Sequence, residues 1–246
     1  MPLPTLVVVG AMKCGTSALH RYLDRHPEIA MARGKELNFF YGPEQPPDDD
    51  PGTWWRWGQW HRGPEWYASC FDGRYAVRGE ASPGYTDPGN PEVAARMAAL
   101  VPDVRLVCLV REPLDRALSQ WRHHVRDRTE IRPMAAALLD PASQYVARSR
   151  YRACLEPFLR EFPRPQLLVV VQERLLADRR RELARVFAHA GADPAFWSSD
   201  LEPRVHVGGG RQEPVPDDLR TAFGQRVAAD LAGLRELLDD DLPEWR

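Results

Sequence analysis

The sequence predicts an α/β protein in which a central parallel sheet is covered by helices on both faces. Two observations lead to this class. Short apolar or β-branched runs alternate along the chain with longer stretches of helical periodicity. One run, residues 104–110, is apolar nearly throughout, which is typical of a strand buried on both faces of a parallel sheet. In such sheets ligands bind at the carboxyl ends of the strands.

The expected strands are short, and each precedes a stretch with helical spacing. The first, residues 6–9, ends at Gly10, and a helix follows at 17–25 with Leu19, Tyr22 and Leu23 on one face. Prolines in the first turn and a closing glycine support several of the later helices. Further strands are expected at 75–79, 104–110 and 166–171, and further helices at 91–100, 113–126, 145–162, 174–190 and 217–238.

Length and composition indicate one domain over residues 1–246. The chain has 246 residues, 43% of them hydrophobic, which is enough to fill a sizeable core. Two stretches are too long to be simple connections: a Trp-rich loop insertion around 41–66 and a Gly-rich loop around 198–216. For Trp54, Trp55, Trp57 and Trp60, a lid or acceptor platform and simple packing are equally good interpretations, whereas Trp66 is expected to pack in the core.

The charge balance excludes several partners. Lys and Arg number 33 against 35 Asp and Glu, a net charge of −2, so we expect no nucleic-acid partner. No apolar window is long enough for a membrane span and no leader is visible, which favours a cytoplasmic protein. The four cysteines are widely spaced, so no metal site is expected. The strong preference for Arg over Lys suggests a bacterial source of high GC content.

The loop after the first strand carries a phosphate-binding signature. It reads Gly-Ala-Met-Lys-Cys-Gly-Thr-Ser over residues 10–17 and leads into a helix, whose N-terminal N–H groups attract anions. Lys13 is one of only two lysines, with Lys35, and adds a compact positive charge. The fold is therefore expected to be P-loop-like. Lys13 nevertheless lies two residues before Gly15, unlike the nucleotide triphosphatase pattern, and Arg111 stands where an acidic metal ligand would end the strand.

This loop, followed by His26-Pro27 and by Lys-Glu-Leu-Asn-Phe-Phe at 35–40, resembles the opening of sulfotransferases that use 3′-phosphoadenosine 5′-phosphosulfate (PAPS), particularly the carbohydrate-type and bacterial branch. The resemblance spans nearly the whole chain. Further matches occur in order at 79–85, at 111–119, at Tyr151 with Leu155, and at 241–245. It implies transfer of a sulfuryl group from PAPS to a hydroxyl of a carbohydrate or small-molecule acceptor without a metal, leaving adenosine 3′,5′-bisphosphate.

The resemblance also implies which residues bind the donor. Lys13 would contact the 5′-phosphosulfate, and Arg111 with Ser119 would hold the 3′-phosphate. Thr16 could instead be only a helix cap, Arg111 a structural ion-pair partner, and the late glycine loop merely flexible. Arg116 is expected to form a salt bridge or a cap. The full set of expected donor-binding residues is Lys13, Cys14, Gly15, Thr16, Ser17, Arg111, Ser119, Tyr151, Gly210 and Arg211.

For catalysis the resemblance implies Glu36 as the base, with Lys13 and Lys35 as the catalytic cations. Lys35 would hold Glu36 ionised or help the leaving group, although adjacent side chains of an extended chain point apart. Glu80 is the competing base. The family often has Lys after this Glu, and here Ala81 stands instead, so Lys35 or the loop of Arg211 would replace that cation.

The missing cation at Ala81 leaves a second function open. A catalytically weak, nucleotide-binding module of the same fold would also lack this cation. A small P-loop kinase is a weaker alternative, because of the position of Lys13 and the missing acidic metal ligand. The acceptor and the oligomeric state are not determined by the sequence.

Overall fold

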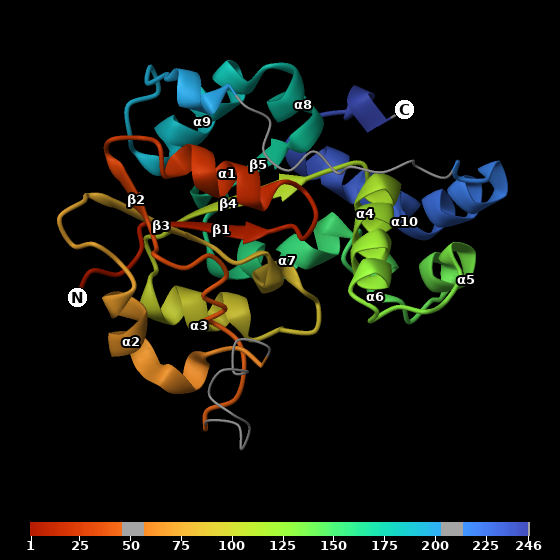
Figure 1. Cartoon of the computed structure of the whole chain (residues 1–246), viewed down its shortest axis with the longest axis horizontal. Coiled ribbons are helices and arrows are strands. Elements are labelled where there is room, and N and C mark those ends of the chain that lie inside the picture. Colours follow the sequence, from red (N-terminus) through yellow and green to blue (C-terminus); the bar gives the residue numbers. More distant parts are fainter. Residues whose placement is uncertain (46–56, 203–213, 246) are drawn as a thin grey trace.

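The computed structural model describes residues 1–45, 57–202 and 214–245, and it confirms the α/β class (Figure 1). All strand pairs are parallel, and the order across the sheet is β2-β3-β1-β4-β5. β1 lies between β3 and β4, and the chain changes direction across the sheet at this point, which is where such folds bind ligands. The strands are β1 Leu6–Gly10, β2 Ile29–Met31, β3 Val77–Ala81, β4 Arg105–Val110 and β5 Leu167–Val171.

Helices cover both faces of the sheet, as expected for a three-layer protein. α1 and α9 lie over one face and α3 and α7 over the other, while α4, α5 and α6 stand beyond the carboxyl ends of the strands (Figure 1). The helices are α1 Thr16–Leu23, α2 Gly63–Ser69, α3 Val93–Leu100, α4 Pro113–Arg126, α5 Met134–Leu139, α6 Gln144–Ala147, α7 Tyr151–Glu161, α8 Gln172–Ala177, α9 Arg179–Ala190 and α10 Asp217–Leu238.

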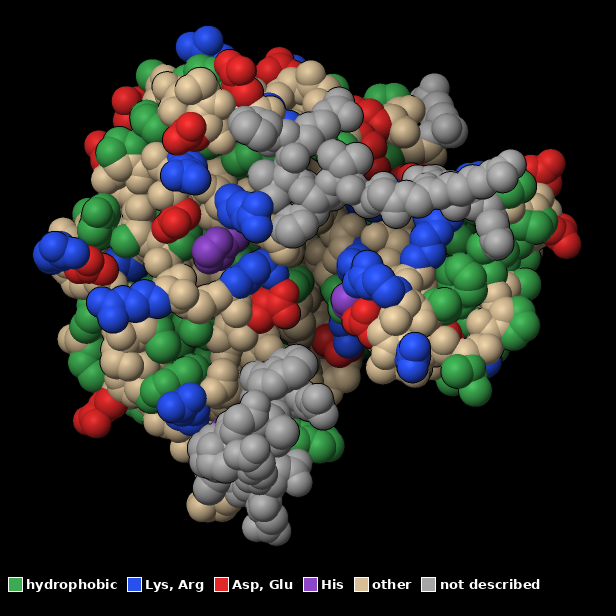
Figure 2. All heavy atoms as spheres, viewed as in Figure 1, with side chains coloured by type: hydrophobic (Ala, Val, Ile, Leu, Met, Phe, Trp, Pro, Cys, Tyr) green, Lys and Arg blue, Asp and Glu red, His purple; other side chains and the backbone are tan. Residues whose placement is uncertain are grey.

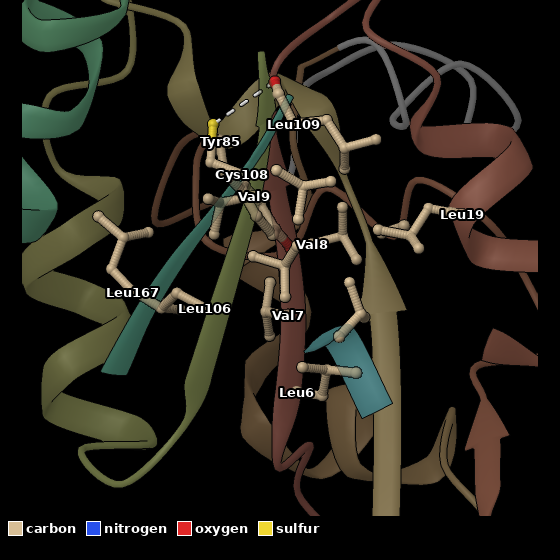
Figure 3. Packing of buried hydrophobic residues seen from close by; sticks show 14 of the residues in the cluster. Leu6, Val7, Val8, Val9, Leu19, Tyr85, Leu106, Cys108, Leu109 and Leu167 are labelled. Carbon is tan, nitrogen blue, oxygen red and sulfur yellow. Dashed lines mark hydrogen bonds between the residues drawn. The ribbon is translucent and has the colours of Figure 1, made fainter. Parts of the chain in front are cut away.

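The central strand is buried along its whole length. Leu6 to Val9 belong to the same buried cluster as Leu106 and Leu109 of β4 and Leu167 of β5 (Figure 3). A second apolar cluster joins α4, α5, α6 and α10 and includes Leu118 and Phe223. This second cluster fixes α4 beside the carboxyl end of the sheet.

Two helices expected to be continuous are each divided in two, and these predictions were wrong. The stretch 145–162 forms α6 and α7, because the Tyr145 carbonyl accepts hydrogen bonds from Ser149 Oγ at 2.8 Å and from Arg116 at 2.6 Å. The stretch 174–190 forms α8 and α9, because Asp178 starts a new helix by accepting from the backbone N–H of Arg181 at 3.1 Å.

Candidate functional site

The loop of residues 10–17 lies at the carboxyl end of β1 and has the geometry of an anion cradle. Gly10 is required by close packing, since a Cβ there would lie 2.1 Å from Thr86 Oγ1. Gly15 has a left-handed backbone, with φ of 93°, at the N-cap of α1, and no side chain caps this helix. The Ala18 N–H donates to the Gly15 carbonyl at 3.0 Å, and the N–H groups before it in the first turn are left for a ligand. Thr16 lies inside the helix, so the alternative role of Thr16 as its cap is wrong.

Lys13 is half-buried on this loop and lacks an ion-pair partner among the described carboxylates. Burial lowers the pKa of Lys13 below its ordinary value of 10.5, and the nearby positive charges of Arg126 and Arg111 act in the same direction. Asp127 and Glu36 raise the pKa of Lys13, by a smaller amount than burial lowers it. A cation in this setting gains from a bound anion.

Cys14 and Tyr151 hold the loop from behind. Both are buried, and the Cys14 Sγ lies 3.5 Å from the Tyr151 Oη. The same hydroxyl donates to the carbonyl of Arg111 at 2.7 Å, so Tyr151 ties the phosphate loop to the end of β4. Burial raises the pKa of the Cys14 thiol to about 11, which keeps it protonated at neutral pH.

Asp115 and Ser119 lie four residues apart on one face of α4, and Arg111, which precedes this helix, contacts Asp115. Arg111 NH2 lies 3.4 Å from Asp115 Oδ2, and 54% of the Asp115 side chain is exposed. This is the ion pair that the alternative role of Arg111 requires. An exposed pair of this kind contributes little and leaves the guanidinium available to a phosphate.

Glu36 lies against the end of β3, where its backbone N–H donates to the Ala81 carbonyl at 3.0 Å. Its side chain is 49% exposed, and its carboxylate forms an ion pair with the Lys35 ammonium. The backbone of Glu36 is left-handed, with φ of 62°, and this turn brings the two adjacent side chains together. The expectation that they point apart was based on an extended chain and is wrong here.

Glu80, the competing base, is fully buried, and its carboxylate is already hydrogen-bonded. Its carboxylate accepts hydrogen bonds from Tyr67 at 2.5 Å, Ser82 at 2.6 Å and Tyr85 at 2.8 Å. Burial raises the pKa of Glu80, while these three hydrogen bonds lower it. The carboxylate therefore has the environment of a structural anchor.

Arg148 makes a polar contact with the phosphate loop that the sequence did not predict. Arg148 forms an ion pair with Asp87 and also donates to the sulfur of Met12 at 2.9 Å. It thus joins the segment after β3 to the phosphate loop. In a chain with so many arginines, no local pattern distinguishes Arg148.

His123 on α4 was also missed as a neighbour of the site. It lies within electrostatic reach of both Lys13 and Glu36. Burial lowers the pKa of His123, an effect to which the charge of Lys13 adds. The side chain is thus expected to be neutral at physiological pH.

Of the tryptophans described in this stretch, Trp60 and Trp66 pack against other side chains and Trp57 is exposed to solvent. The Trp60 ring packs on Phe39, with ring centroids 5.2 Å apart, and Trp66 lies beneath the Arg62 guanidinium. Trp57 is 54% exposed. Trp54, Trp55, Gly210 and Arg211 lie outside the described residues.

Basic side chains and histidines stand on both sides of a furrow between the α1 side and the α4 side of the molecule (Figure 2). Within residues 1–45, 57–202 and 214–245, no group of three or more His, Cys, Asp or Glu side chains is suited to hold a metal ion. In the same ranges, no helix has both the length and the apolar character needed to cross a membrane.

Comparison with known proteins agrees with this geometry. Residues 4–197 match the profile of the sulfotransferase family. The chain belongs to this family. Mouse heparan sulfate glucosamine 3-O-sulfotransferase 3A1 is 31% identical to it over 196 residues, which cover 75% of this chain and 44% of that protein. The sulfotransferase chain described here thus spans less than half the length of that curated relative.

Solved sulfotransferases have the same fold. The crystal structure of a sulfotransferase from Alicyclobacillus acidocaldarius matches with a TM-score of 0.80 and 30% identity, over 100% of both chains. The sulfotransferase domain from the curacin biosynthetic pathway matches with a TM-score of 0.62 over 94% of this chain and 98% of that domain, and at 14% identity it supports the fold alone.

Proposed function

We propose that this sulfotransferase moves the sulfuryl group of PAPS to a hydroxyl of a carbohydrate or small-molecule acceptor. One observation carries the proposal: the half-buried Lys13 of the phosphate loop lies within electrostatic reach of Glu36, at the switch point of the sheet. One site would thus combine a cation for the leaving phosphate with a carboxylate for the acceptor proton.

The donor would be held at two places. The uncapped N-terminus of α1, with Lys13 and the Ser17 hydroxyl, suits the 5′-phosphosulfate. Arg111, just before α4, and Ser119, within α4, suit the 3′-phosphate, for which a guanidinium offers paired donors. Cys14 and Tyr151 would support both places from behind, since their side chains are buried.

The chemistry needs positioning and charge stabilisation more than covalent participation. Glu36 accepts the proton of the acceptor hydroxyl as the hydroxyl oxygen forms its bond to sulfur. Lys13 stabilises the negative charge that develops on the phosphate oxygen as the bond from that oxygen to sulfur breaks. Lys35 supplies a second cation beside Ala81, because its partner Glu36 is hydrogen-bonded to the Ala81 carbonyl.

The acceptor class follows from the relatives and from the openness of the site. The similar mouse protein is named for a heparan sulfate glucosamine acceptor. In this chain the half-exposed Glu36 is reachable by a bulky hydroxyl compound. A catalytically weak nucleotide-binding module is the second candidate, since Ala81 leaves the neighbouring strand end without its own cation.

A turnover assay separates these candidates. The protein is incubated with ³⁵S-labelled PAPS and a panel of glucosamine-containing oligosaccharides and small hydroxyl compounds, and transferred label is measured together with released adenosine 3′,5′-bisphosphate. Equal amounts of both products support the proposal. Tight binding of PAPS without transfer of label to any acceptor supports the catalytically weak nucleotide-binding module. Magnesium-dependent phosphoryl transfer, measured with ATP in place of PAPS, would support a kinase instead.

A further inference from the structure

Arg116 on α4 is a fully buried cation whose hydrogen-bond acceptors are neutral. Its side chain is 0% exposed. Nε donates to Ser149 Oγ at 2.8 Å, NH1 to Gln120 Oε1 at 2.7 Å and NH2 to the Tyr145 carbonyl at 2.6 Å. The guanidinium caps α6 as expected, but the expected salt bridge to a described carboxylate is not formed.

A buried charge without a counter-charge is costly. Hydrogen bonds to neutral groups recover only part of the lost hydration, and apolar side chains of similar size are often as stable or more so. Besides burial, the groups that act most strongly on Arg116 are Tyr151, Cys14 and Arg148, and no described carboxylate forms an ion pair with its guanidinium. Cys14 and Tyr151 are both neutral at pH 7, because burial raises the pKa of each. In the part of the chain that the structure describes, the positive charge of Arg116 thus has no carboxylate as an ion-pair partner.

The position of Arg116 indicates where a balancing anion would be. Arg116 acts electrostatically on Cys14 of the phosphate loop and on Tyr151. Tyr151 in turn contacts both Cys14 and the backbone of Arg111. Arg116 also lies three residues before Ser119 on the same helix. It is thus one layer behind the residues proposed to hold the two phosphates.

We infer that Arg116 is an electrostatic positioning residue for the donor, whose phosphates supply the counter-charge that this buried guanidinium lacks. This inference rests on the proposed function and goes beyond it, because Arg116 touches neither phosphate. At an effective dielectric constant of about 20 and a separation of roughly 10 Å, a unit charge contributes about tenfold to the affinity for an anion.

One substitution removes this charge and a second one neutralises it. Arg116→Met deletes it and keeps an apolar side chain of similar reach. Gln120→Glu keeps Arg116 and places a carboxylate against its NH1, changing one atom of a buried side chain. Gln144→Ala is the matched control, since it removes the hydrogen bond from Gln120 Nε2 to Gln144 at 2.9 Å and adds no charge.

The experiment measures the affinity for adenosine 3′,5′-bisphosphate by calorimetry and for adenosine by NMR titration. We expect Arg116→Met and Gln120→Glu each to weaken the bisphosphate about tenfold and to leave adenosine unchanged, and Gln144→Ala to change neither. An unchanged bisphosphate affinity in folded variants, or an equal loss for both ligands, would overturn the inference in favour of a structural role. If Arg116→Met does not fold, Gln120→Glu decides alone. Failure of the wild-type protein to bind the bisphosphate would refute the proposed function instead.

Discussion

The buried Glu80 carboxylate accepts a hydrogen bond from the Tyr85 hydroxyl at 2.8 Å, and the same hydroxyl accepts one from the backbone N–H of Phe39 at 2.9 Å. A parallel chain runs through Ser82, whose Oγ donates to Glu80 and accepts from the Asn38 N–H at 3.1 Å. Glu80 thus anchors the segment that carries Glu36. The two carboxylates that the sequence offers as bases have different environments and, we propose, different tasks.

Glu36→Gln tests the assignment of the base. The amide keeps the size of the side chain and removes the proton acceptor, so kcat is expected to fall by ~10²–10⁴ while donor affinity stays nearly constant. Steady-state kinetics at saturating PAPS measure this. Asp103→Asn, an exposed carboxylate before the amino end of β4, is the matched control and should keep full activity. Full activity in Glu36→Gln would remove Glu36 from the mechanism.

Glu80→Gln is expected to cost stability. Three hydroxyl groups donate to the carboxylate, and an amide NH₂ in place of one oxygen leaves at least one of them unpaired. The free energy of unfolding should fall by about 1–3 kcal/mol, measured by urea denaturation. The half-exposed Glu36→Gln should change it by less than about 0.5 kcal/mol. Unchanged stability together with a complete loss of kcat would transfer the role of base to Glu80.

The affinity for adenosine 3′,5′-bisphosphate should fall at alkaline pH through Lys13. In the free protein the pKa of Lys13 is lowered below 10.5, and a bound phosphate raises it because it favours the charged ammonium. The complex therefore holds more protons than the free protein between these two values. Affinity is full below the free-state pKa and declines as the pH rises through the window.

Calorimetric titrations from about pH 8 upward, where the ligand phosphates are fully ionised, measure this decline. Lys13→Arg should flatten it, because a guanidinium stays charged throughout. The same slope in Lys13→Arg and in the wild-type protein would assign it to another group.

Arg111→Ala should weaken donor binding without a matching loss in kcat, because the 3′-phosphate does not change during transfer. The affinity for adenosine 3′,5′-bisphosphate is expected to fall at least tenfold, while that for adenosine 5′-phosphate changes little. Asp115→Asn removes the exposed partner of Arg111 and should keep or raise the affinity. Equal affinity in Arg111→Ala and wild type would show that the 3′-phosphate binds elsewhere.

Strong local signals account for the parts of the fold that were predicted well. Helix α4 begins at Pro113 and α10 at Asp217, as predicted, because prolines mark both starts. The strand β2 was missed because its three residues are too few to show a period. The break between α6 and α7 depends on Arg116, which lies far along the chain from Tyr145, so the local sequence of this stretch did not reveal it.

The candidate site likewise contains residues that the sequence could propose and contacts that it did not reveal. Lys13, Arg111 and Ser119 follow strand ends, and parallel strands bring such positions together, so the sequence was sufficient to propose them. The Lys35–Glu36 ion pair and the Arg148–Asp87 contact depend on a left-handed backbone and on a pairing across 61 residues. Neither has a local pattern that would predict it.

The most direct test of the central claim is a calorimetric titration with adenosine 3′,5′-bisphosphate in the presence of EDTA, compared with ATP under the same conditions. The account predicts that the bisphosphate binds equally well with and without EDTA, because Lys13, Arg111 and the N-terminus of α1 supply the positive field. ATP, which lacks the 3′-phosphate, should bind at least tenfold more weakly. Equal affinities for the two nucleotides, or bisphosphate binding that EDTA abolishes, would contradict the account.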